Sequence, residues 1–197
     1  GPVTFLAGAE VAPDAEAKLD PGLERFLSGT ARAQATIGGP VRYDAAAMLR
    51  LLDVYPLWCL EQSVSHGFPL ALLPDGALAG PDRAGRLQEA VARVLDKQRF
   101  DGAFGLWSAN GEAQNWLSAY ATDFLLRARA AGAAVPEAAL RDAVKALSEA
   151  ADDAGTDAQG NADQAYRLYV LARAGKGRPG AARVMAESLN TLPTPLA

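Results

Sequence analysis

Side chains suited to acyl-transfer chemistry lie within eight positions of one another in the segment YPLWCLEQSVSHGF, which begins at Tyr55. Cys59 and His66 are the only residues of their types in the 197-residue chain. Two residues separate Cys59 from Gln62, so on the first turn of a helix their side chains would lie about 60° apart and within reach of each other. A thiol and a side-chain amide in that position can condense, with loss of ammonia, into an internal thioester.

A helix that starts at this cysteine would assist the chemistry. The backbone N–H groups at a helix N-terminus favour a thiolate and stabilise an oxyanion during acyl transfer. His66 follows Gln62 by four residues and Cys59 by seven, so an unbroken helix would place all three on one face. Pro69 removes the N–H that would bond the carbonyl of Ser65, and this predicts a kink in the helix.

Other interpretations of the same residues remain open. Cys59 could be a small buried apolar residue and Gln62 a solvated helix residue, in which case the chain is a helical-repeat binding scaffold without chemistry. Alternatively, Cys59 could be the nucleophile of a cysteine enzyme with His66 as its base. That arrangement would place base and nucleophile on one short helix and lacks a separate orienting residue. A single cysteine excludes an internal disulfide or a multi-thiolate metal site, and no metal or cofactor is predicted.

Helices are predicted to position these residues. Half of the residues are hydrophobic, and Ala and Leu dominate over Val, Ile and Thr, which favours an all-α fold. Asp44 is a plausible N-cap for a helix to about Val54, which Pro56 ends, and a second helix should begin near Cys59. Asp82 can cap a third helix, which runs to about Gln98 and precedes the loop FDGAFGLW. The other predicted helices are Gln114 to Ala131, Pro136 to Ala151, Ala162 to Ala174 and Pro179 to Leu189.

The helices also show an internal repeat. The segment AYATDFLLRARAAG, which begins at Ala119, resembles AYRLYVLARAG, which begins at Ala165, 46 residues later. Each repeat reads as a helical hairpin with an apolar side that it cannot bury alone. The hairpins are therefore predicted to stack, either as an open solenoid or as a closed ring.

The chain divides at its composition boundary. Residues 1–43 are broken by proline and glycine and read as a lead-in segment, in which Gly1 and Pro2 resemble the scar of a tag-removal protease. Residues 44–197 read as one helical domain. Nineteen basic and 23 acidic residues give a net charge of −4 without a basic run, which argues against nucleic-acid binding. No apolar stretch approaches the ~18 residues that cross a bilayer, so membrane insertion by this segment is not expected.

Four sequence blocks in the same order resemble the thioester domain of the bacterial alpha-2-macroglobulins, across nearly all of residues 44–197. CLEQ is similar to the CxEQ signature of thioester-containing macroglobulins and complement proteins. The blocks KQRFDGAFGLW, NWLSAYATDFLLRARAAGAAVP and NADQAYRLYVLARAG follow it. The resemblance places the reactive cysteine at Cys59 and the acyl-donating glutamine at Gln62, whereas Glu61 is a spacer without an assigned chemical role.

The resemblance implies a broad-spectrum protease inhibitor that acts once and is not a turnover enzyme. In this family a protease cleaves a bait segment elsewhere in the parent protein, the parent rearranges, and a lysine of the protease attacks the thioester. The products are a covalent isopeptide at Gln62 and a free thiol at Cys59. The implied partners are target proteases and the other domains of the parent, and the implied location is the periplasm or cell envelope. The resemblance also favours closure of the hairpins into an α/α toroid of the terpenoid-cyclase-like type. The end TLPTPLA resembles the start of a further helix, so the toroid is expected to be truncated.

Three positions depart from the family pattern. Trp58 stands where the family usually has a small glycine, so its bulk could change how the thioester is shielded. The family often has arginine in place of His66, which favours a surface or capping role for this histidine over a role as a helper in the chemistry. Complement proteins that attack hydroxyl groups use a histidine that would fall near residues 152–157, where this chain has none. Amines are therefore the expected targets.

Aromatic residues along the helices are expected to pack between the hairpins. They are Phe104, Trp107, Trp116, Tyr120, Phe124, Tyr166 and Tyr169. The alternative is that Trp107 and Trp116, together with Tyr55 and Trp58, keep water away from the thioester.

Overall fold

The computed structural model describes residues 7–9, 11–12, 15–18, 20, 22–31, 58–72, 82–151 and 158–187. Contacts between Cα atoms divide the chain into two units, Gly1–Arg42 and Tyr43–Ala197. The predicted helix from Asp44 to Val54, the residues Tyr55 and Pro56, the positions 152–157 and the end TLPTPLA lie outside the described residues. The interpretation of the two parts as a lead-in segment and a thioester domain stays a prediction.

The described part of the first unit contains one short 3-10 helix, η1 (Leu23–Arg25). It begins after Gly22, whose N–H donates to the Asp20 carboxylate at 2.9 Å.

Helices are the regular elements of the second unit in its described residues, which confirms the all-α prediction. Among the described residues, two isolated antiparallel β-bridges, Gln98 to Phe104 and Gly105 to Ala113, lie between the third and fourth helices. The helices start and end within a few residues of the predicted positions, except that α6 begins four residues earlier than predicted. They are α2 (Leu60–Leu72), α3 (Arg83–Leu95), α4 (Asn115–Ala130), α5 (Glu137–Ala150), α6 (Ala158–Arg173) and α7 (Pro179–Glu187).

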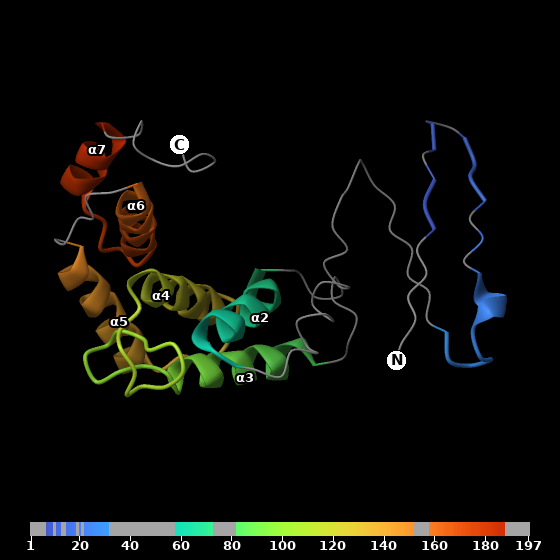
Figure 1. Ribbon diagram of the computed structural model, residues 1–197, viewed down its shortest axis with the longest axis horizontal. Coiled ribbons are helices and arrows are strands. Elements are labelled where there is room, and N and C mark those ends of the chain that lie inside the picture. The colour runs from blue at the N-terminus through green and yellow to red at the C-terminus, as the bar shows by residue number, and fades with distance from the viewer. Residues whose placement is uncertain are drawn as a thin grey trace. The chain divides into compact units, whose positions relative to one another are not determined.

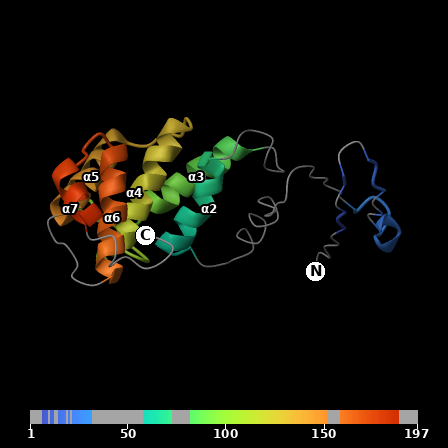
Figure 2. The ribbon, with the colours of Figure 1, turned by 90° about the horizontal axis from the view of Figure 1, so that it is seen from above.

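The six helices form three stacked hairpins, as the sequence repeat predicts (Figures 1 and 2). One layer contains α2, α4 and α6, in which α4 packs against both of the others. In the second layer α3 packs against α2 and α4, α5 packs against α4 and α6, and α7 packs against α6. The described helices therefore fit either a solenoid or part of a ring, and closure into a toroid stays a prediction.

Local sequence explains where these helices begin and end. The Asp82 carboxylate accepts a 2.9 Å hydrogen bond from the Gly85 N–H, so Asp82 is the N-cap of α3 as predicted. After α4, Gly132 adopts a φ of 93°, and the N–H of Ala133 returns to the carbonyl of Ala128 at 2.9 Å. This left-handed glycine with a backward hydrogen bond terminates the helix. The same arrangement recurs at Gly175 after α6.

Apolar side chains of α2, α3 and α4 form the main core. Its fully buried members include Leu60, Val64, Leu70, Val91, Val94, Phe104, Phe124 and Leu125. A second cluster lies between α4, α5 and α6 and contains Ala119, Leu147, Ala151, Val170 and Leu171. The two clusters share α4, so α4 connects the hairpin of the candidate site to the rest of the domain.

A buried carboxylate ties α4 to α6. Asp123 is 2% exposed, and its carboxylate accepts from Arg127 at 3.0 Å and from Arg173 at 3.1 Å. The hydroxyl of Tyr166 donates to the same carboxylate at 3.2 Å. Burial and the nearby Asp123 charge raise the pKa of Tyr166 well above its usual range, so this phenol stays protonated and can donate.

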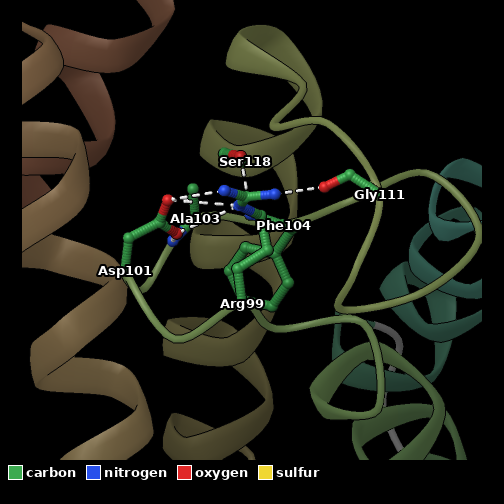
Figure 3. A network of polar contacts seen from close by, with 6 residues as sticks. All are labelled: Arg99, Asp101, Ala103, Phe104, Gly111 and Ser118. Atoms are coloured by element: carbon green, nitrogen blue, oxygen red, sulfur yellow. Dashed lines mark hydrogen bonds and ion pairs between the residues drawn. The ribbon is translucent and has the colours of Figure 1, made fainter.

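The loop between α3 and α4 is held by polar contacts of its own (Figure 3). The Arg99 guanidinium pairs with the Asp101 carboxylate at 3.0 Å and donates to the carbonyl of Gly111. The N–H of Phe104 donates to the Ser118 hydroxyl at 3.0 Å, which fixes the loop to α4. This hydrogen bonding gives the Gly-rich segment a definite conformation despite its composition.

The same loop also contacts α5 and α2. The side chain of Gln98 donates to the carbonyl of Ala139 at 2.8 Å. Gly102 has a φ of 87°, and a Cβ at that position would lie 2.2 Å from the carbonyl oxygen of Asp142. At the other end, the carbonyl of Leu106 accepts from the N–H of Leu60, the first residue of α2, at 2.7 Å. The loop is therefore a bridge between α5 and the start of α2.

We expect Gly102→Ala to destabilise the domain more than Gly132→Ala does. Both glycines have a positive φ, so each substitution strains the backbone by about 1–2 kcal/mol. An added methyl group would meet backbone atoms within 4 Å at Gly102 but not at Gly132, and the clash adds roughly 1–3 kcal/mol. Urea unfolding of both variants measures the difference. Equal free energies of unfolding would contradict the close contact with α5.

Candidate functional site

Cys59 immediately precedes α2 and is held in place by backbone contacts. Its side chain is buried, with the residue 7% exposed, and its thiol is free. Its carbonyl accepts 2.9 Å hydrogen bonds from both the N–H and the hydroxyl of Ser63. The next residue, Leu60, is fully buried and donates its N–H to the carbonyl of Leu106 at 2.7 Å. The thiol therefore stands at the N-terminus of a helix whose start is fixed by the loop.

Gln62 lies on the first turn of α2 and folds back toward Cys59. Its side-chain oxygen Oε1 accepts from the N–H of Cys59 at 3.4 Å. This is the geometry of a capping box, in which the third helical residue reaches back to the N-cap residue. The contact turns the carboxamide of Gln62 toward the residue that carries the thiol. The structure thus brings the predicted pair together, and formation of the thioester stays a prediction.

His66 lies one turn further along α2 and is buried at 6% exposure. The ring of Trp58 meets it edge-on, with 5.4 Å between ring centroids, and the Arg86 guanidinium lies 3.4 Å from its Nε2. The predicted surface position of His66 is therefore wrong, because Trp58 and Arg86 cover the ring. The helix continues through Pro69 to Leu72, so the proline does not end it.

Two cations lie beside the start of α2, and sequence reasoning did not identify them. The Arg93 guanidinium lies 3.6 Å from the centroid of the Trp58 ring. Lys97, four residues on, is 5% exposed, and its Nζ donates to the carbonyl of Arg93 at 2.9 Å. Burial lowers the pKa of Lys97, while the charges of Asp96 and Cys59 act in the opposite direction. Nothing local in the sequence indicates that the end of α3 meets Cys59.

The aromatic residues divide into buried and exposed groups. Phe104 and Phe124 are fully buried, which confirms their predicted packing role. Trp107 is 60% exposed, Tyr169 is 45% exposed and Trp116 is 39% exposed, so the prediction of core packing is wrong for these three. Trp116 nevertheless stacks on Tyr120, with ring centroids 5.0 Å apart. Trp58 precedes Cys59 in the chain, and the ring of Trp58 contacts the ring of His66.

The described residues contain neither a candidate metal site nor a membrane-spanning helix. No group of His, Cys, Asp or Glu side chains among them has an arrangement that could hold a metal ion. None of the helices in this part of the chain combines the length and apolar character needed to span a bilayer.

Comparison with known proteins identifies relatives of this chain. No family model matches it. Alpha-2-macroglobulin of Escherichia coli strain K12 is 33% identical over 179 residues, a match that covers 82% of this chain and 11% of the relative. The chain thus spans about a tenth of the length of that protein.

Solved structures show the same relationship. Salmonella alpha-2-macroglobulin reacted with methylamine superimposes with a TM-score of 0.67 at 32% identity, over 76% of this chain and 11% of that one. Trypsin-activated alpha-2-macroglobulin from Escherichia coli gives a TM-score of 0.63 at 32% identity, over 70% and 11% of the respective chains. The chain belongs to the bacterial alpha-2-macroglobulin family, and it corresponds to a helical segment of these larger proteins.

We expect Gln62→Ala to leave the fold nearly as stable as before, whereas Leu60→Ala destabilises it strongly. Gln62 is half-buried and makes one long hydrogen bond, so its loss should cost less than about 1 kcal/mol. Leu60 is fully buried in the main core, and truncation there costs about 2–5 kcal/mol. Urea unfolding compares the two variants. A large loss of stability in Gln62→Ala would indicate that Gln62 serves the fold and not the chemistry.

Proposed function

We propose that this chain is the thioester-bearing segment of a macroglobulin that traps proteases covalently. The observation that carries the proposal is the return of the Gln62 carboxamide to the N–H of Cys59, at 3.4 Å. This contact brings an acyl donor to the residue that carries a free thiol, just before the start of a helix. The scaffold interpretation gives this amide a capping role alone, and the cysteine-enzyme interpretation gives it no role in the chemistry.

The proposed chemistry has two steps. In the first, the Cys59 sulfur adds to the side-chain carbonyl carbon of Gln62, ammonia leaves, and a thioester closes the ring. In the second, a lysine amine of the protease adds to the same carbon. The carbon–sulfur bond then breaks, the electron pair stays on sulfur, and the amine loses its extra proton to solvent. The result is an isopeptide at Gln62 and a thiol at Cys59.

The helix start supports both steps. The N–H groups of the first turn of α2 point toward the N-terminus of the helix, which Cys59 precedes. Their partial positive charge favours a carbonyl oxyanion and a leaving thiolate. The burial of Cys59 also limits access of water to the bond. In the family pattern, cleavage of a bait segment and rearrangement of the parent protein make the bond accessible to the protease.

The relatives agree with this reaction. One was crystallised after reaction with methylamine, a small amine that can attack a thioester as a lysine does. Another was crystallised after activation by trypsin, a protease. We propose that the present chain likewise reacts with amines after a protease activates its parent protein. It would then act as a single-use inhibitor with no catalytic turnover and no cofactor.

The wider setting is proposed from the same resemblance. Residues 44–197 form the thioester domain, the hairpins belong to an α/α toroid, and other domains of the parent protein shield the bond. The partners are the captured proteases and these neighbouring domains. The location is the periplasm or cell envelope.

Methylamine treatment of the full-length protein is expected to release one thiol from each chain. The amine opens the thioester, so a thiol reagent that finds no free Cys59 beforehand should find it afterwards. The control is Gln62→Ala, which cannot form the thioester. Its Cys59 thiol should react with the reagent before methylamine is added, although more slowly than the thiol of an unfolded chain because Cys59 is buried. A wild-type thiol that reacts equally before and after methylamine would contradict the proposal, since a scaffold or a thiol enzyme would behave in that manner.

Amines are expected to be captured in large excess over alcohols. Within these 197 residues no histidine follows position 66 to form an acyl intermediate, so we expect direct attack on the carbonyl of Gln62. Neutral amines attack thioesters directly far better than hydroxyl groups do. The experiment activates the full-length protein with a protease in the presence of a labelled amine and a labelled alcohol, in wild type and in His66→Ala. Alcohol capture that disappears in His66→Ala would overturn direct attack and give His66 a catalytic role.

A further inference from the structure

A buried lysine lies beside the proposed thioester, and the reaction described above does not use it. Lys97 follows the end of α3 and is 5% exposed. Its backbone carbonyl accepts from the N–H of Gly105 at 3.1 Å, and its Nζ donates to the carbonyl of Arg93 at 2.9 Å. Both ends of the residue are therefore fixed, one by the loop that docks on α2 and the other by the last turn of α3.

The charge of this lysine lacks a direct carboxylate partner. Among the described residues, the Lys97 ammonium hydrogen-bonds to a carbonyl, and no carboxylate lies within ion-pair distance of it. The loop nevertheless brings Lys97 to the start of α2, because Gly105 donates to the carbonyl of Lys97 and the adjacent Leu106 accepts from the N–H of Leu60, the residue after Cys59. A buried cation without an ion-pair partner costs stability, so a position of this kind is a candidate for a functional role.

The neighbouring charges are already engaged elsewhere. The Arg93 guanidinium covers the Trp58 ring and pairs with the Glu89 carboxylate. Arg86, also on α3, faces His66 of α2. Asp96 precedes Lys97 and partly offsets its charge. Lys97 is therefore the buried basic residue at this end of α3, with its ammonium held by a carbonyl and not by a carboxylate among the described residues.

We propose that Lys97 stabilises the thiolate of Cys59 as that thiolate leaves Gln62, and so sets the rate at which the thioester is opened by amines. This inference rests on the proposed function. When the amine adds to the Gln62 carbonyl carbon and the carbon–sulfur bond breaks, a full negative charge appears on the Cys59 sulfur. The ammonium of Lys97 keeps its own proton throughout and offsets that charge in a buried site, where a charge pair interacts more strongly than in water.

The test compares Lys97 variants of the full-length protein. Lys97→Met removes the charge and keeps much of the side-chain volume, whereas Lys97→Arg keeps the charge. Lys145→Met is the matched control, because Lys145 lies on α5 with its side chain 72% exposed. The measurement is the rate of thiol release by methylamine.

Release should slow about tenfold in Lys97→Met, which corresponds to the loss of a modest charge interaction. It should stay within about threefold of wild type in Lys97→Arg and remain unchanged in Lys145→Met. Rescue by arginine separates a role of charge from a role in packing, because arginine restores the charge with a different shape. Lys97→Gln provides a second neutral variant if Lys97→Met does not fold.

A second measurement uses the opened protein. After complete reaction with methylamine, the thiol of Cys59 should be alkylated by iodoacetamide more slowly in Lys97→Met than in wild type, since the thiolate is the reacting species. Equal release rates and equal alkylation rates in wild type and in both neutral variants would overturn the role of Lys97 alone. A Lys97–Gln62 isopeptide in the wild-type peptide map would also overturn it, since the lysine would then be a nucleophile. A wild-type thiol that is free before methylamine would instead overturn the proposed function, and this inference with it.

Discussion

The N–H of Leu60 donates a 2.7 Å hydrogen bond to the carbonyl of Leu106, and this contact joins the N-terminus of α2 to the loop between α3 and α4. The first N–H groups of a helix have no partner within the helix, so an external acceptor here determines where α2 begins. That start places Cys59 just outside the helix and Gln62 on its first turn. A shift of the start by one residue would separate the carboxamide from the cysteine N–H that it now contacts.

The loop can serve as this acceptor because it is rigid. Arg99, Asp101 and Ser118 hold it from within and against α4, and Gly102 allows it to approach the backbone of α5 (Figure 3). The same loop fixes Lys97 through its hydrogen bond from Gly105. A segment rich in glycine therefore helps to position the start of α2, with its acyl donor and thiol, and the buried Lys97. The loop differs from a flexible linker because hydrogen bonds hold it to α2, α4 and α5.

Sequence reasoning was most accurate where local signals decide the structure. Asp82 as an N-cap was sufficient to locate the start of α3, because a cap acts within a few residues. The pairing of Cys59 with Gln62 also depends on local spacing, and the structure brings the two together. The resemblance of four ordered blocks supplied the family, which local physics could not do.

The errors concern contacts between distant parts of the chain. His66 is buried because Trp58 and Arg86 cover it, and Arg86 belongs to another helix. The loop brings Lys97 to the start of α2, although Lys97 is 38 positions from Cys59 in sequence, so no spacing rule indicates this arrangement. Trp107 is exposed in the loop between α3 and α4, although its type favours burial. Only the packing of the hairpins decides these three cases.

The bond between Cys59 and Gln62 is the central claim, and peptide mass spectrometry of the native full-length protein tests it most directly. A thioester predicts that the peptide containing both residues is lighter than its sequence by one ammonia and resists alkylation at Cys59. After methylamine the same peptide should carry methylamide at Gln62 and an alkylatable Cys59. A peptide of full sequence mass, with Cys59 alkylated and Gln62 unmodified in protein protected from amines, would contradict the claim.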